Sequence, residues 1–147
     1  IMSVRENIAS NLLSVISAIS SPDIIKATRQ PFLLDELSDK QYPAVIVQTS
    51  EENRDDSELG SGAKTRHGTT IDFVVLGFVK GAEANIDTKR NELITAIETA
   101  LETDITRSGN ALDTEVVQVE TDEGSLFPVG GIRMTIRCMY EYQAGTP

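Results

Sequence analysis

The sequence predicts an α+β domain in which a mixed, mostly antiparallel sheet of four to five strands packs against two main helices. Two segments repeat apolar residues at three- and four-residue steps, as amphipathic helices do, and several others alternate or cluster β-branched residues, as strands do. The predicted strands are neighbours along the chain, which favours hairpins and antiparallel pairing. A length of 147 residues suits one domain, so residues 1–147 are expected to fold as a single unit.

The two helices are predicted from apolar residues that share one face. The first spans residues 4–19, where Ser3 is placed to cap the N-terminus and Glu6 completes a capping-box pattern. The second begins after a cap at Asp87 or Thr88. The apolar faces consist of Val4, Ile8, Leu12, Val15, Ile16 and Ile19 in the first helix and of Leu93, Ile94, Ile97 and Leu101 in the second.

The clearest strand is the last one, residues 131–142, in which apolar and polar residues alternate. Earlier strands are predicted at residues 24–28, 42–49 and 116–121, and the second of these contains a β-branched run. The resulting order is a helix, a weak strand, two strands, a helix and two strands.

Residues 65–80 form an unusually long strand-like stretch. Sixteen extended residues span about 53 Å, whereas a typical strand has five or six residues. Either Gly68 and Gly77 bend this stretch, or its first half, residues 65–70, projects from the domain as an extended arm.

An acidic loop is predicted at residues 51–64, because Gly60 and Gly62 lie in a run of charged residues. A solvated loop is one interpretation of this run, and a surface that faces a partner or a lumen is the other. The acidic residues of this loop are Glu51, Glu52, Asp55, Asp56 and Glu58.

Composition excludes several classes of protein. With 23 acidic and 13 basic residues the net charge is −10, which argues against a protein that gains affinity by neutralising phosphates. One cysteine cannot form an internal disulfide, and one cysteine with one histidine cannot build a Cys/His zinc site. No apolar run is long enough to cross a membrane, and the first residues lack the pattern of a signal peptide, so no membrane partner is expected.

The motifs of catalysis are also missing from the sequence. Residues 60–65 resemble a phosphate loop only superficially, because Ala63 separates the glycine from the lysine and a strand follows. His67 is the only histidine, and the sequence contains no nucleophile elbow (Gly-x-Ser-x-Gly) with which it could form a catalytic triad. Cys138 lies at an apolar position of an alternating strand, which favours a buried core thiol. The acidic clusters do not have the spacing of a calcium loop. We therefore expect no enzyme, no cofactor and no metal.

The order of these features resembles the tail terminator proteins of long-tailed bacteriophages, and the resemblance covers nearly the whole chain. It consists of the helix Val4–Ile19, the strand Tyr42-Pro43-Ala44-Val45-Ile46-Val47, the acidic Gly-bearing loop, the long strand Thr65–Lys80, the helix that begins Asp87-Thr88-Lys89-Arg90, and the strand Gly131–Tyr142 with its Tyr-x-Tyr ending.

The resemblance implies a structural virion protein that forms a hexameric ring on the end of the tail tube. Such a ring stops tube polymerisation and joins the tail to the head. The implied partners are copies of the chain itself, the tail tube protein, head–tail connector or neck proteins, and a sheath protein if the tail is contractile. The implied location is the tail or neck of a virion assembled in the host cytoplasm. DNA would pass through the ring without specific binding, because an acidic lumen repels phosphates.

Two groups of residues are candidates for contacts in such a ring. The acidic loop residues would face the lumen or a partner, and the arm would add a strand to the sheet of a neighbouring subunit. Arg133 and Arg137 would pair with carboxylates across a subunit boundary, or else lie on an ordinary solvated strand face. The candidate intersubunit contacts are Thr65, Arg66, His67, Thr69, Arg133 and Arg137.

Two other classes of function remain open at this stage. A head–tail connector or stopper ring would also be structural but would dock on the head side. A small cytosolic enzyme or effector-binding domain would instead need a deep pocket with convergent polar groups.

Overall fold

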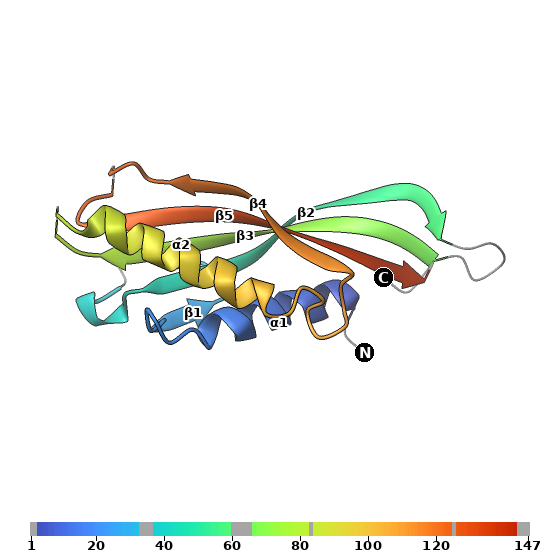
Figure 1. The fold of residues 1–147 in the computed structure, drawn as a ribbon, viewed down its shortest axis with the longest axis horizontal. Helices are drawn as coiled ribbons and strands as arrows, with labels where there is room; N and C mark the ends of the chain where they lie inside the picture. The colour runs from blue at the N-terminus through green and yellow to red at the C-terminus, as the bar shows by residue number, and fades with distance from the viewer. Residues whose placement is uncertain (1–2, 33–36, 60–65, 83, 125, 144–147) are drawn as a thin grey trace.

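The structure is a computed structural model that describes residues 3–32, 37–59, 66–82, 84–124 and 126–143 (Figure 1). It confirms the α+β fold class. The elements in chain order are α1 (Val4–Ser17), β1 (Lys26–Thr28), the short 3-10 helix η2 (Asp39–Gln41), β2 (Ala44–Leu59), β3 (Arg66–Lys80), α2 (Ile86–Glu102), β4 (Asp113–Thr121) and β5 (Val129–Gln143).

The strands form a five-stranded mixed sheet in the order β1-β2-β3-β5-β4. Only β1 and β2 run parallel, and the other neighbouring pairs are antiparallel. Short connections favour this for β2 with β3 and for β4 with β5, whereas α2 and β4 separate β3 from β5 in the chain. The central strand β3 pairs along its whole length with β5, from Arg66 opposite Gln143 to Lys80 opposite Val129.

The core lies between the two helices and one face of the sheet. Alternate residues of β3 and β5 point into it, and the apolar faces of α1 and α2 cover them. Gly77 lets α2 approach the sheet closely, because a Cβ there would lie 2.8 Å from side-chain atoms of both Leu93 and Ile132. The fully buried core residues of these four elements include Ile8, Leu12, Ile16, Ile71, Phe73, Val75, Leu93, Ile97, Met134, Ile136, Cys138 and Tyr140.

The helix ends differ slightly from the prediction. The backbone amide of Glu6 donates to the Ser3 hydroxyl, which confirms the cap of α1, but the Glu6 carboxylate pairs with Arg29 instead of returning to the cap. α1 ends at Ser17, two residues before the predicted Ile19. The N-cap of α2 is Asn85, and neither Asp87 nor Thr88 occupies that position, so the predicted cap was wrong.

The predicted acidic loop is wrong for residues 51–59, which continue β2. Pairing with β3 holds these residues in a strand despite their charge, and two register shifts accommodate the irregular part of the ladder. Residues 60–64 lie outside the described residues. β3 itself is one continuous strand of 15 residues, so neither Gly68 nor Gly77 interrupts it.

Three strands project beyond both helices at one end of the molecule (Figure 1). We call this part the sheet arm and define it as residues 53–59 of β2, 66–70 of β3 and 139–143 of β5. It begins at the level of Met139, the last residue of β5 that pairs with β4. The predicted projection therefore exists for residues 66–70, but as the middle strand of three and not as a single extended arm. Thr65 lies outside the described residues.

Candidate functional site

The sheet arm presents a long open strand edge. β1 pairs with β2 only from Ala44 to Ile46, so within the described residues the outer edge of β2 from Val47 to Leu59 has no partner strand. An open edge carries backbone N–H and C=O groups that can pair with another chain. Residues 66–70 cannot offer such an edge, because β2 and β5 flank them on both sides. Strand addition at the arm would therefore use β2 or the short outer edge of β5 that lies past its last residue paired with β4, Met139.

A buried tyrosine fixes the base of the sheet arm. The hydroxyl of Tyr140, which is 0% exposed, donates a hydrogen bond to the carboxylate of Glu52. An Nη1 atom of Arg5 in α1 lies 3.7 Å from the same carboxylate. Glu52 therefore ties α1 to the sheet and is not a free surface charge, although its neighbour Glu51 is exposed.

We expect Tyr140→Phe to lower the free energy of unfolding by about 1.5–3 kcal/mol, because it removes a hydrogen bond to a mostly buried carboxylate. Urea unfolding of the variant and the wild type measures this difference. Glu52→Gln is the matched control, since it keeps an acceptor for the hydroxyl and should cost less. Equal stability of Tyr140→Phe and the wild type would show that this contact does not hold the arm.

The predicted contact residues occupy different environments. Thr69 is only 2% exposed and donates its hydroxyl to the carbonyl oxygen of Asn53, so it belongs to the inside of the arm. The backbones of Arg66 and His67 lie in β3 opposite Leu59 and Glu58. The side chains of the residues at the tip of the arm lie outside the described residues. These are Asp55, Asp56, Glu58, Arg66 and His67.

The two arginines of β5 lie on the sheet face that the helices do not cover. Arg137 makes a two-point ion pair with Asp72 of the same chain, with N···O distances of 2.9 and 3.1 Å. This pair raises the pKa of the Arg137 guanidinium. Arg133 is exposed and stands between Leu76 and Glu120 in the strand register. Arg137 therefore has an internal partner, and Arg133 is the more accessible of the two.

A second ion pair anchors the turn between β4 and β5, and sequence reasoning missed it. Arg90 of α2 lies 2.5 Å from a carboxylate oxygen of Asp122, and the two side chains are 8% and 6% exposed. Asp122 also accepts hydrogen bonds from the backbone amides of Leu126 and Gly131. In the sequence, the only sign that Asp122 has a structural role is its position two residues before Gly124, in a predicted turn.

Burial works to raise the pKa of Asp122, but the two backbone amides and Arg90 outweigh it, so that the pKa lies below its ordinary value. A carboxyl with a lowered folded-state pKa adds stability above its unfolded pKa, which is about 4. That stability is lost as the pH falls through the folded-state value.

We therefore expect the free energy of unfolding to decline as the pH drops below about 4, and we expect this decline to be shallower in Asp122→Asn. Urea unfolding across this acidic range measures both slopes. Identical slopes would show that Asp122 does not contribute to acid sensitivity.

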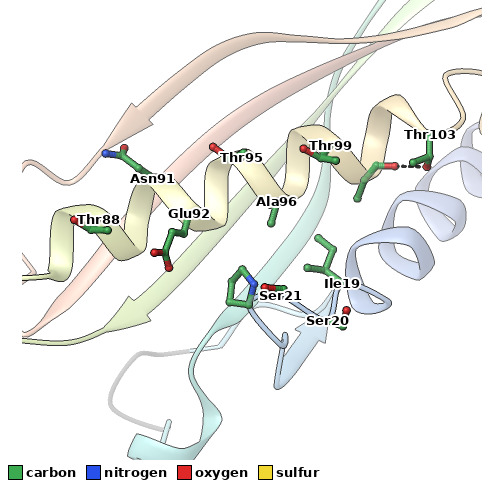
Figure 2. Close-up of a pocket in the computed structure, with 12 residues that line it drawn as sticks. Ile19, Ser20, Ser21, Thr88, Asn91, Glu92, Thr95, Ala96, Thr99 and Thr103 are labelled. Carbon is green, nitrogen blue, oxygen red and sulfur yellow. Dashed lines mark hydrogen bonds between the residues drawn. The ribbon is translucent and has the colours of Figure 1, made fainter.

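A groove of about 720 Å³ runs between α2 and the turn that follows α1 (Figure 2). In Figure 2, Glu92 and Ala96 of α2 point toward the turn that carries Ile19 and Ser21, whereas Asn91, Thr95 and Thr99 lie on the other side of the helix in this view. Among the described residues that line the groove, only Glu92 is ionisable. The residues on the helix side are Thr88, Asn91, Glu92, Thr95, Ala96, Thr99, Ala100 and Thr103.

Cys138 is a fully buried core thiol, as predicted, and burial raises its pKa. Its sulfur lies 3.7 Å from the hydroxyl of Thr114. A raised thiol pKa disfavours the thiolate that a nucleophile needs.

The buried side chain of Arg107 donates to backbone carbonyl oxygens of Leu101 and Asp104, where it completes the end of α2.

Two further properties concern the part of the chain that the structure describes. Its side chains include no group of three or more His, Cys, Asp or Glu residues placed to hold a metal ion. Neither of its two long helices is at once apolar enough and long enough to cross a membrane.

No protein-family model and no curated protein sequence matches this chain. A chain in a solved structure described as the virion of a native gene transfer agent particle is similar to it, with a TM-score of 0.46 and 11% sequence identity. That alignment covers 95% of this chain and 92% of the other.

Proposed function

We propose that this chain is a structural protein of a phage-like virion and that it acts as a tail terminator. In this role copies of the chain form a ring on the end of the tail tube, stop its polymerisation and join the tail to the head connector. The observation that carries the proposal is the sheet arm, whose open β2 edge projects beyond the rest of the domain. The order of sequence features that resembles tail terminators supports the specific role.

An open strand edge suits assembly because it pairs readily with another chain. Natural proteins usually cover or blunt such edges, since an exposed edge invites aggregation. An edge that is long, projecting and left open is therefore best explained by a partner. Identical subunits that contact one another head to tail form closed rings when the rotation between them closes.

The net charge of −10 agrees with passage of DNA through the ring. A negatively charged surface repels phosphates, so the genome slides past and does not adhere. The repulsion acts over a Debye length of about 8 Å at physiological salt, which restricts it to residues near the lumen.

Shortening the sheet arm tests the proposal. Asn53 and Thr70 are cross-strand partners, so an Asn-Gly turn that replaces residues 54–69 closes the hairpin at its base. We expect this variant to remain folded but to lose ring assembly, because it lacks the projecting part of the open edge. Circular dichroism checks the fold, and electron microscopy of particles complemented with the variant checks assembly. Normal particles from a folded, shortened variant would argue against an assembly role for the arm.

A further inference from the structure

We draw no further inference here: the strongest candidate, the turn between β4 and β5 on which Leu126 and Phe127 are exposed and which the Arg90–Asp122 ion pair anchors, carries none, because nothing in the described part of the structure shows what covers these two apolar side chains.

Discussion

Replacing Arg90 with Ala is expected to lower the free energy of unfolding by about 3–5 kcal/mol, the usual cost of removing one partner of a buried ion pair. The guanidinium contacts Asp122, and both side chains are less than one tenth exposed. Its loss leaves the Asp122 carboxylate buried with only backbone amides as partners. The turn between β4 and β5 would then lose its link to α2.

The control for this prediction is the second partner of Arg90. Asp87 lies 2.8 Å from the same guanidinium but is 72% exposed, so Asp87→Ala should cost at most about 1 kcal/mol. Urea unfolding of both variants measures the contrast. Similar losses for the two variants would show that burial of the Asp122 pair is not what stabilises the turn.

Replacing Ile136 with Ala is expected to cost about 2–5 kcal/mol, because it leaves a cavity in a packed core. Ile136 is 0% exposed and stands between Phe73 and Val116 in the strand register. Three strands meet at this point, so the surrounding side chains have little freedom to fill the space.

The neighbouring residue provides the control. Thr135 lies on the opposite face of β5, and Thr135→Ala should change the free energy of unfolding by no more than about 0.5 kcal/mol. Denaturant unfolding of both variants tests the assigned faces. A larger loss for Thr135→Ala than for Ile136→Ala would mean that the register of β5 is wrong.

The sequence predicted best those elements whose side chains alternate or repeat over many residues. Every second residue of β5 from Ile132 to Tyr140 is apolar, and the structure confirms that these residues face the core, whereas Met139 lies on the other face and is exposed. The apolar faces of α1 and α2 were predicted equally well, because a helix that packs against a sheet needs an apolar stripe along one side. The weak strand was confirmed only in part, since β1 is limited to Lys26–Thr28.

The prediction of a loop at residues 51–59 failed because pairing with a neighbouring strand outweighed the acidic composition of this segment. Residues 51–59 contain five carboxylates and little apolar character, which is typical of a loop. Their strand structure comes from the ladder with β3, a contact that local sequence patterns do not contain. For the same reason the extended arm was predicted as one strand, although its middle strand is flanked by β2 and β5.

The roles of individual charges were the hardest feature to predict. Glu52 and Asp122 belong to acidic clusters in the sequence, but Tyr140 and Arg90 hold them in the folded chain. These partners lie 88 and 32 residues away in the sequence, so no motif joins them.

Electron microscopy of particles from a strain that encodes this chain, with its gene deleted, tests the central claim most directly. A tail terminator predicts overlong tails without heads, because nothing stops tube polymerisation or joins the tail to the connector. Tails of normal length beside DNA-filled, unjoined heads would instead assign the chain to the connector. Particles indistinguishable from the wild type would contradict a structural role in the virion.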